Sequence, residues 1–487
     1  MSRLSMGSEG LDQVLLGGLP PHRLYLLEGD PGVGKTTLAV QFLLAGLASG
    51  ERSLYITLSE TEEEVRSIAA SHGWNLDGLA LFELSALEQQ LRMDAENTIF
   101  RPSDVELTET TRALLAHVDQ VKPDRVVFDS LSELRLLAQN PLRYRREVLN
   151  LKTYFSSRKC TVFLLDDRTS DPGDQQLQSL AHGVIDMQQF APDYGADRRR
   201  LRVVKLRGAP FRGGYHDMKI ETGGVRVFPR LVAAEHFSRF ERQPISSGLA
   251  ELDALLGGGV DRGTSTLILG NAGTGKSTLI AQYLCAAARR GEKSVIFGFD
   301  ELRGTSIARA DSLGMGLGKY VDEGLVTIQQ VDPAELSPGE LVQRAIQLVE
   351  RENVRFVALD TLNGYLHAMP ADKHLYIQLH ELLSYLGQRG VTTLMVMAQV
   401  GTIGASSSPV EISYVADNVL LLRYFEARGR IRKAISVVKK RTGQHEDTIR
   451  ELTISGERGI QIGPPLSAFT GVLTGLPQFH GKDDELS

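Results

Sequence analysis

The sequence predicts an α/β fold: two tandem domains, each a mainly parallel sheet flanked by helices, with an antiparallel hairpin near the C-terminal end of each domain. Three observations predict this arrangement. A segment over residues 9–60 is repeated over 248–301. Short apolar runs alternate with amphipathic helical patterns in both halves, as in parallel βαβ units. A glycine-rich loop lies between an apolar run and a helical pattern in both copies, so each copy has a strand-to-helix turn at the same point.

The repeat keeps its register over its whole length. Lys35 and Lys276 end the two glycine-rich loops, Glu60 and Glu301 end the next apolar runs, and both pairs are 241 residues apart (276 − 35 and 301 − 60). This period is far longer than that of solenoid repeats, so each copy is expected to be a whole domain. We expect a first domain over 1–236, a linker over 237–247, a second domain over 248–470 and a tail over 471–487.

The elements of the first half follow in order along the chain. Four apolar runs predict buried parallel strands: RLYLLEG at 23–29, RSLYITL at 52–58, DRVVFD at 124–129 and CTVFLLD at 160–166. Helical patterns between them include TLAVQFLLAGLA and EVRSIAASHG. LRVVKLRG and YHDMKIETGGVRVF then predict antiparallel strands joined by turns, and NVLLLRY, KAISVVKKR and IRELTIS predict the same in the second half.

The composition excludes several classes of protein. Of 487 residues, 42% are hydrophobic and 23% are charged, which excludes wholesale disorder. Lys plus Arg is 54 and Asp plus Glu is 60, so the net charge of −6 argues against a protein that coats DNA. Cys160 and Cys285 lie far apart in sequence, which argues against a disulfide framework and fits a reducing cytoplasm. The N-terminus MSRLSMGSEG has no apolar signal segment, and no apolar run is long enough for a membrane span.

Two phosphate-binding loops carry the clearest functional signal. GDPGVGKT and GNAGTGKS both fit G-x-x-x-x-G-K-[ST] in the strand–loop–helix context that this motif needs. Backbone N–H groups of such a loop surround phosphate oxygens, the lysine reaches the β- and γ-phosphates, and the following hydroxyl ligates Mg²⁺. ATP and Mg²⁺ are therefore the expected cofactors. The expected ATP-binding residues are Gly29, Asp30, Pro31, Gly32, Val33, Gly34, Lys35, Thr36 and Thr37, and Gly270, Asn271, Ala272, Gly273, Thr274, Gly275, Lys276, Ser277 and Thr278.

A second metal ligand is expected at the end of a nearby strand. Asp129 ends DRVVFD and Asp360 ends VRFVALD. A strand-end aspartate alone would also fit a solvated side chain, but its recurrence at matched places favours a metal role. The expected ligands are Thr36 with Asp129 and Ser277 with Asp360.

Hydrolysis also needs a carboxylate that orients the attacking water or takes its proton. Glu60 ends SLYITLSE, 25 residues after Lys35 (60 − 35), and Glu301 ends SVIFGFDE, 25 residues after Lys276 (301 − 276). Asp300 precedes Glu301. An acid at this place could instead cap the next helix, because TEEEV follows Glu60. The matched spacing favours a catalytic role for both glutamates.

With these residues in place, the chain resembles the RecA superfamily and, within it, the KaiC family of double-domain clock-type ATPases. The resemblance covers about residues 5–470 and rests on the two loops, the strand-end acids and the hairpin signatures KLRG at 205–208 and KKR at 439–441. It implies two RecA-like domains, each with a pair of catalytic carboxylates after its second strand. Asp300-Glu301 keeps such a pair, whereas Ser59-Glu60 keeps only the second member.

The resemblance also implies how copies of the chain assemble. In KaiC-like proteins, hairpin cations point at the nucleotide of the adjacent subunit, which here would be Lys205, Arg207, Lys439 and Arg441. From the residues alone, solvated strand charges would be the preferred interpretation. The family implies a homo-hexameric ring with ATP at subunit interfaces. We expect the ATP hydrolysis to serve signalling or clock-type regulation through regulatory protein partners in the cytoplasm.

The second domain of this family is also a serine/threonine autokinase that phosphorylates an adjacent Ser-Thr pair before an apolar strand. In EISYVADN, Ser413 occupies the serine position and Tyr414 replaces the threonine. Ser413 is therefore the candidate phosphosite. Alternatively, Ser413 and Tyr414 simply pack at a subunit interface.

Two rival functions fit the same fold. One is a nucleic-acid-stimulated ATPase of the recombinase or helicase type. The basic run at 197–202 could contact nucleic acid, but its place between two predicted strands fits a solvated hairpin better. The net charge and the absence of a basic loop with interleaved aromatic residues argue against it, so nucleic acid is not an expected partner. The other is a nucleotide-gated scaffold that binds ATP and hardly turns it over.

Overall fold

The structure is a computed structural model, and it describes residues 3–84, 103–138, 140–167, 176–192, 195–367, 375–399, 414–473 and 477–480. The chain forms two compact units, Met1–Arg230 and Leu231–Ser487. This division falls six residues before the expected end of the first domain (236 − 230). Leu231 and Ala233 are buried in the second unit, and the Ser238 hydroxyl donates to Gln388 O at 2.9 Å. The end of the segment expected in the first domain and the start of the expected linker therefore both pack on the second unit.

One sheet of nine strands forms the centre of the first unit. Its strands are β1 (Leu24–Gly29), β2 (Ser53–Thr57), β3 (Ala80–Glu83), β4 (Arg125–Asp129), β5 (Thr161–Asp166), β6 (Gly183–Phe190), β7 (Arg198–Leu206), β8 (His216–Glu221) and β9 (Gly224–Phe228). Their order is β3-β2-β4-β5-β1-β6-β7-β8-β9. Pairing is parallel from β3 to β6 and antiparallel from β6 to β9. The expected parallel sheet and the antiparallel hairpins are confirmed.

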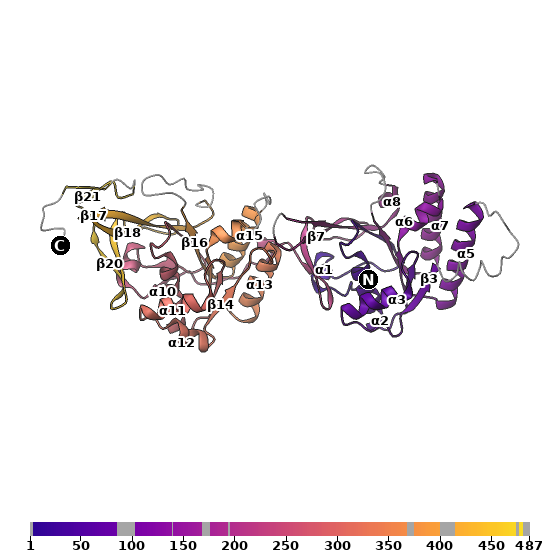
Figure 1. Cartoon of the computed structure of the whole chain (residues 1–487), viewed down its shortest axis with the longest axis horizontal. Coiled ribbons are helices and arrows are strands. Elements are labelled where there is room, and N and C mark those ends of the chain that lie inside the picture. The colour runs from indigo at the N-terminus through magenta and orange to yellow at the C-terminus, as the bar shows by residue number, and fades with distance from the viewer. Residues whose placement is uncertain are drawn as a thin grey trace. The chain divides into compact units, whose positions relative to one another are not determined.

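Helices cover both faces of this sheet (Figure 1). They are α1 (Glu9–Val14), α2 (Lys35–Ala48), α3 (Glu62–Ser71), α5 (Ser103–Val121), α6 (Leu131–Ala138), α7 (Pro141–Ser157) and α8 (Gln176–Leu180). Successive strand residues point to opposite faces, so Tyr25 and Leu27 pack with α1, α2 and α3, whereas Leu24 and Leu26 pack with α5, α6 and α7. The inner parallel strands β1, β2, β4 and β5 are thus buried on both faces, as their continuous apolar runs predict.

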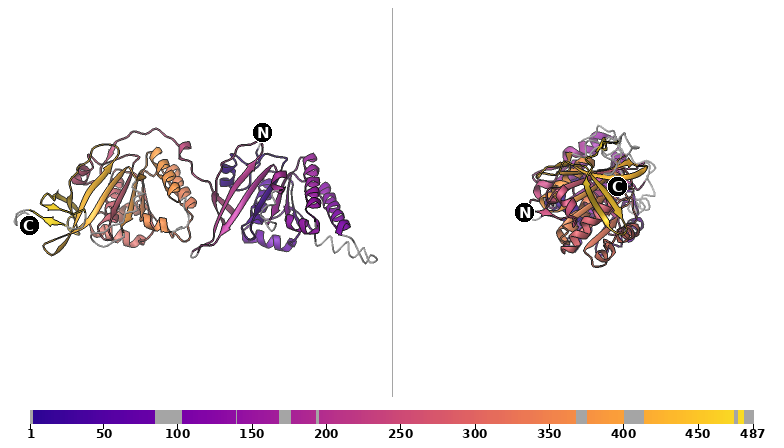
Figure 2. Two further views of the ribbon diagram at one scale, coloured as in Figure 1. Left: turned by 90° about the horizontal axis from the view of Figure 1, so that it is seen from above. Right: turned by 90° about the vertical axis from the view of Figure 1, so that its left-hand side faces the viewer.

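The second unit repeats this architecture around its own nine-stranded sheet. Its strands are β12 (Ser265–Gly270), β13 (Ser294–Gly298), β14 (Val326–Gln330), β15 (Phe356–Asp360), β16 (Thr392–Ala398), β17 (Asn418–Ala427), β18 (Arg430–Lys440), β19 (Arg450–Ser455) and β20 (Gly459–Pro465). The order is β14-β13-β15-β16-β12-β17-β18-β19-β20, with β17 to β20 antiparallel. Figure 2 shows the strands of each unit side by side in one sheet.

The helices of the second unit also divide between two faces. They are η1 (Ala233–Glu235), α9 (Ala250–Leu255), α10 (Lys276–Arg289), α11 (Arg303–Ser312), α12 (Leu317–Asp322), α13 (Pro338–Arg351), α14 (Leu362–His367) and α15 (Leu375–Gln388). One core contains residues of α9 to α12, and the other contains residues of α13 and α15. Two short strand pairs complete the unit: β10 (Pro244–Ile245) with β11 (Val260–Asp261), and β21 (Phe469–Thr470) with β22 (Gln478–Phe479). Among the helices within the described ranges, none is both long and apolar enough to cross a membrane.

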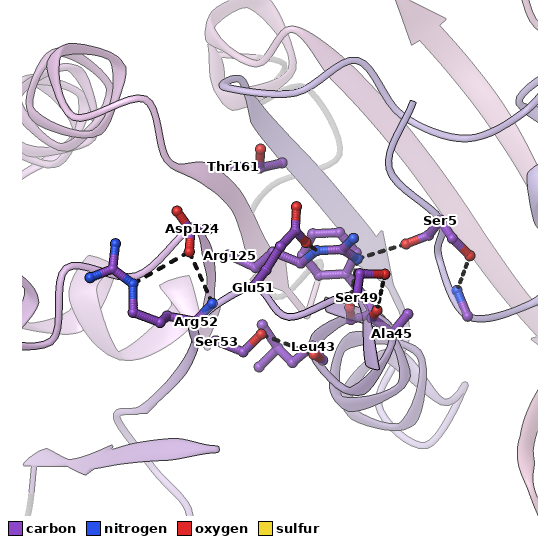
Figure 3. Close-up of polar contacts among 12 residues, drawn as sticks. Ser5, Leu43, Ala45, Ser49, Glu51, Arg52, Ser53, Asp124, Arg125 and Thr161 are labelled. Atoms are coloured by element: carbon purple, nitrogen blue, oxygen red, sulfur yellow. Dashed lines mark hydrogen bonds and ion pairs between the residues drawn. The ribbon is translucent and has the colours of Figure 1, made fainter. Parts of the chain in front are cut away.

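A buried arginine in the first unit makes contacts that an arginine from another position makes in the second unit. The Arg125 guanidinium, on β4, donates to Ser5 O at 2.7 Å, pairs with Glu51 and lies 4.6 Å above the centre of the Phe42 ring (Figure 3). Gly46 leaves room for it, because a Cβ at that position would lie 2.6 Å from Arg125 Cδ.

In the second unit a different element supplies the guanidinium. Phe356 stands where Arg125 would be (356 − 125 = 231), and Ala287 replaces Gly46 (287 − 46 = 241). Arg290, after α10, donates to Ser246 O at 2.8 Å and to Glu292 at 3.1 Å. In both units an arginine thus contacts the corresponding backbone carbonyl, of Ser5 or Ser246, and the corresponding carboxylate, of Glu51 or Glu292. The arginine itself comes from different positions.

Two candidate nucleotide sites

Each phosphate loop lies between the central strand of its sheet and the following helix. The first connects β1 to α2, and the second connects β12 to α10. Gly34 and Gly275 precede the helices with φ of 103° and 107°. In addition to this left-handed backbone, a Cβ there would lie 2.5 Å from Ile220 Cδ1 and 2.3 Å from Ile454 Cδ1. The left-handed backbone therefore favours glycine at both positions, and a larger residue would also have to displace the tip of the isoleucine side chain.

The hydroxyl and the aspartate expected to hold a metal lie together in both units. The Thr36 hydroxyl donates to Asp129 Oδ2 at 2.7 Å, and the Ser277 hydroxyl donates to Asp360 Oδ1 at 3.0 Å. Burial raises the pKa of both carboxyl groups, although the hydroxyl hydrogen bonds partly offset it. A buried carboxylate beside a hydroxyl is an oxygen donor set that suits Mg²⁺. The residues present therefore fit the expected metal.

The two loop lysines have different partners. The Lys35 ammonium donates to Gly29 O at 2.8 Å and to Asp30 O at 2.9 Å, and it forms an ion pair with Asp167 at 2.8 Å. The Lys276 ammonium donates to Asn271 O at 2.7 Å. Burial lowers the pKa of Lys276 to about 8, an effect that Asp360 partly offsets. The described part of the second unit shows no carboxylate paired with this lysine.

The Glu60 carboxylate is half-buried, and in the described part of the chain no hydrogen bond offsets the burial of one of its oxygens. Its Oε2 atom is buried and has no hydrogen-bond partner among the residues that the structure describes. Its backbone is held instead, because Glu60 N donates to the Thr57 hydroxyl at 2.8 Å. Burial, followed by repulsion from Asp129, Glu64 and Asp167, raises the pKa of Glu60 to about 7. A carboxyl group with such a pKa can accept or donate a proton near neutral pH.

Glu301 has the opposite environment. Arg309 donates to its two oxygens at 3.2 and 2.7 Å, and the Ser306 hydroxyl donates at 2.6 Å. Burial would raise the pKa of Glu301, but these hydrogen bonds outweigh it, so the pKa is lowered. Asp300 accepts a hydrogen bond from the Thr361 hydroxyl, next to Asp360.

The hairpin cations lie at the start of the antiparallel region of each sheet. Lys205 contacts Gln178 O and Arg207 donates to Ser179 O at 2.9 Å. Lys439 donates to Ala416 O at 2.7 Å, and Arg441 donates to Tyr414 O at 2.6 Å. Each pair thus contacts the backbone that leads into the first strand of its own hairpin. Their expected role toward an adjacent subunit stays a prediction.

The candidate phosphosite Ser413 lies outside the described residues. Its neighbour Tyr414 is described and is 70% exposed.

Several residues at these sites were not singled out from the sequence. The Tyr55 hydroxyl, on β2, donates to Asp129 at 2.6 Å, and Asp167 and Arg309 contact Lys35 and Glu301. The double aspartate that ends CTVFLLDD was a usable signal for Asp167, since it follows the strand next to β1. Arg309 carried no such signal, because it lies within an ordinary amphipathic helix.

The fold and these sites together define a P-loop ATPase with two tandem RecA-like domains. The protein-family model described as "ATPase: KaiC" matches residues 4–232 and 245–467, and the chain therefore belongs to the KaiC family.

Curated relatives match along nearly the whole chain. The circadian clock oscillator protein KaiC of Thermostichus vulcanus is 28% identical, over 98% of this chain and 92% of its own length. The circadian clock protein KaiC3 of Synechocystis sp. is 25% identical, over 99% of this chain and 96% of its own length. The circadian clock oscillator protein KaiC of Prochlorococcus marinus is 26% identical, over 100% and 97%.

Proposed function

We propose that this KaiC-family ATPase binds one Mg·ATP in each unit and hydrolyses it at the subunit interfaces of a homo-hexameric ring. The observation that supports this most strongly is the recurrence of a hydroxyl bonded to a buried aspartate, Thr36 with Asp129 and Ser277 with Asp360, at the start of the helix that follows each phosphate loop. When bound there, Mg²⁺ would neutralise charge on the β- and γ-phosphate oxygens.

The protein's own groups would do the remaining chemistry. Loop N–H groups and the lysine hold the phosphates. Glu60 or Glu301 orients a water molecule and takes its proton as the water oxygen attacks the γ-phosphorus. The bond from that phosphorus to the bridging oxygen breaks, and ADP and inorganic phosphate leave. Lys205, Arg207, Lys439 and Arg441 would stabilise the charge of this step from the adjacent subunit, as the family resemblance implies.

We propose a biological role for this ATP hydrolysis from the relatives, whose names describe circadian clock proteins. Clock-type regulation or signalling through protein partners in the cytoplasm is the corresponding role here. The two cysteines are both free and buried, as a reducing compartment would leave them.

Phosphate release and light scattering test this proposal together. With Mg·ATP the protein should release phosphate and grow in mass to that of a hexamer, because nucleotide bound between subunits stabilises the assembly by mass action. A protein that stays monomeric with saturating Mg·ATP would contradict the ring. Phosphate release that requires single-stranded DNA would favour the nucleic-acid-stimulated rival.

A second activity, serine autokinase chemistry in the second unit, is proposed on the acidic pair Asp300-Glu301, because the family resemblance implies catalytic carboxylates at this place. The γ-phosphoryl group would pass to a serine oxygen, a carboxylate would take the hydroxyl proton, and ADP would leave. The acceptor would be Ser413. Incubation with labelled ATP tests it. Label should enter wild type and be lost in Ser413→Ala and Glu301→Gln. Hydrolysis without incorporation would leave a pure ATPase.

A further inference from the structure

The first nucleotide site contains a carboxylate for which the ATPase chemistry above has no role. Asp167 directly follows β5, and its Oδ1 lies 2.8 Å from the Lys35 ammonium. The hydroxyls of Ser130 and Ser132 donate to Asp167 Oδ2 at 3.1 and 3.2 Å. Lys35 is only 6% exposed, so it meets this carboxylate in a largely desolvated setting. Both partners of the ion pair are thus also held by other hydrogen bonds, Lys35 by loop carbonyls and Asp167 by two serine hydroxyls.

The second unit has no carboxylate at the corresponding place. Val162 pairs with Leu24 on β1, and Thr393 pairs with Ser265 on β12, which sets an offset of 231 between β5 and β16 (393 − 162). Asp167 therefore corresponds to Ala398 (398 − 167 = 231).

The residue that corresponds to Ser132 is Asn363 (363 − 132 = 231), and it binds backbone instead of a carboxylate. Its side chain accepts from Ala398 N at 2.7 Å and donates to Ala398 O at 3.2 Å. The turn after the strand is thus held by hydrogen bonds in both units, but only the first unit places a carboxylate beside the loop lysine.

A carboxylate and a phosphate compete for the same ammonium. In the absence of nucleotide, Asp167 satisfies the charge of Lys35, and it must release the lysine before the β- and γ-phosphates can take its place. From this juxtaposition, Asp167 bound to Lys35 in the first site and Ala398 in the second, we propose that Asp167 is a positioning residue that weakens nucleotide binding at the first site. This inference rests on the proposed binding of Mg·ATP by Lys35.

Removal of the Asp167 charge is expected to raise the affinity for nucleotide, whereas removal of an ordinary binding residue lowers it. Loss of the Asp167 charge should tighten Mg·ATP binding at the first site by roughly tenfold, the size expected for one charge-assisted hydrogen bond. A residue that only supported the fold would weaken binding when it is changed.

The first experiment uses the full chain with the second site silenced by Lys276→Ala. Equilibrium titration with Mg·ATP should show tighter binding for Asp167→Asn, and Asp167→Glu, which keeps the charge, should bind about as weakly as the parent. Asp166→Asn is the matched control. Its carboxylate pairs with Arg135 at 3.0 Å instead of Lys35, so this variant should leave the dissociation constant within about twofold of the parent, because it removes no lysine partner.

The second experiment introduces the corresponding serine and aspartate into the second site, in a chain whose first site is silenced by Lys35→Ala. Asn363→Ser combined with Ala398→Asp should weaken Mg·ATP binding by roughly tenfold, for the same reason. This arm keeps the proposal testable if Asp167→Asn fails to fold.

The outcomes separate this inference from the proposed function. Binding at neither site in the wild-type chain would overturn the nucleotide sites themselves. Binding at both sites, with Asp167→Asn unchanged or weaker and the combined Asn363→Ser and Ala398→Asp change without effect, would overturn the role of Asp167 alone.

Discussion

The two units share a sheet order, a phosphate loop and a hydroxyl–aspartate pair, yet their ionisable groups are tuned in opposite directions. In the first, Lys35 is paired with Asp167, and Glu60 has a pKa raised to about 7. In the second, Lys276 lacks such a partner in the described part, and Arg309 lowers the pKa of Glu301. The two units thus share their backbone geometry, whereas the charged side chains around the two nucleotide sites differ.

This difference teaches that a shared motif does not fix the protonation state of a site. Arg309 and Ser306 on α11 correspond to Ile68 and Val65 on α3 (offset 241, 309 − 68). Two apolar residues at these positions leave the first glutamate without donors, and burial then dominates its pKa. We therefore expect the two sites to contribute differently to catalysis.

The largest expected effect follows from removal of the glutamates. Glu301→Gln should lower hydrolysis at the second site by about 10²–10⁴-fold, because a positioned base contributes that much. Glu60→Gln should do the same at the first site. The measurement is phosphate release in chains whose other site is silenced by Lys35→Ala or Lys276→Ala. An unchanged rate in either variant would mean that its glutamate only caps a helix.

Removal of the loop lysines tests whether the sites are separate. Lys35→Ala and Lys276→Ala should each abolish one of two binding events, because each ammonium is expected to hold its own β- and γ-phosphates. Equilibrium binding of Mg·ATP should show half the wild-type stoichiometry in each case. Loss of all binding from one substitution would indicate a single composite site.

A smaller effect should follow from removal of the cation beside Glu301. Arg309→Met deletes three hydrogen bonds, two of them to Glu301 and one to the Thr278 hydroxyl. The pKa of Glu301 should then rise, because fewer hydrogen bonds oppose the effect of its burial. The second site should acquire a pH-dependent rate between pH 6 and 8, measured as phosphate release in the Lys35→Ala background. If the pH profile of Arg309→Met matched that of the parent, the ion pair would not control Glu301.

The smallest expected effect concerns stability. The folded pKa of Glu60 is above its unfolded value, so the folded state binds more protons between pH 4.5 and 7 and loses stability as pH rises through that range. Glu60→Gln removes this cost and should stabilise the first unit by about 1 kcal/mol at pH 8, after allowance for solvent screening of a half-buried group.

Calorimetry at pH 8 and pH 4.5 checks this stability effect, which should vanish at the lower pH. Glu301→Gln is the control and should destabilise the second unit, because it loses hydrogen bonds from Arg309 and Ser306. A lower unfolding temperature for Glu60→Gln at pH 8 would contradict the raised pKa.

Much of this molecule could be predicted from its sequence. The apolar runs RLYLLEG and CTVFLLD became neighbouring buried strands, and the loops fell at the expected strand-to-helix junctions. These features depend on local pattern and on a repeat that keeps its register. The pairings of Lys35 with Asp167 and of Glu301 with Arg309 depend on which side chains meet across elements, and local pattern does not contain that information. The roles of the hairpin cations and of Ser413 stay predictions.

The pH dependence of kcat/KM for each isolated site tests the central claim most directly, because this quantity reports the pKa of the free protein's base. With the second site silenced by Lys276→Ala, kcat/KM should rise by about tenfold from pH 6 to pH 8, as a base with a pKa of about 7 ionises. With the first site silenced by Lys35→Ala, the profile should show no such rise and should instead fall by about twofold toward pH 8, because Lys276, with a pKa of about 8, loses its proton there. Two profiles of the same shape would contradict the opposite tuning of Glu60 and Glu301.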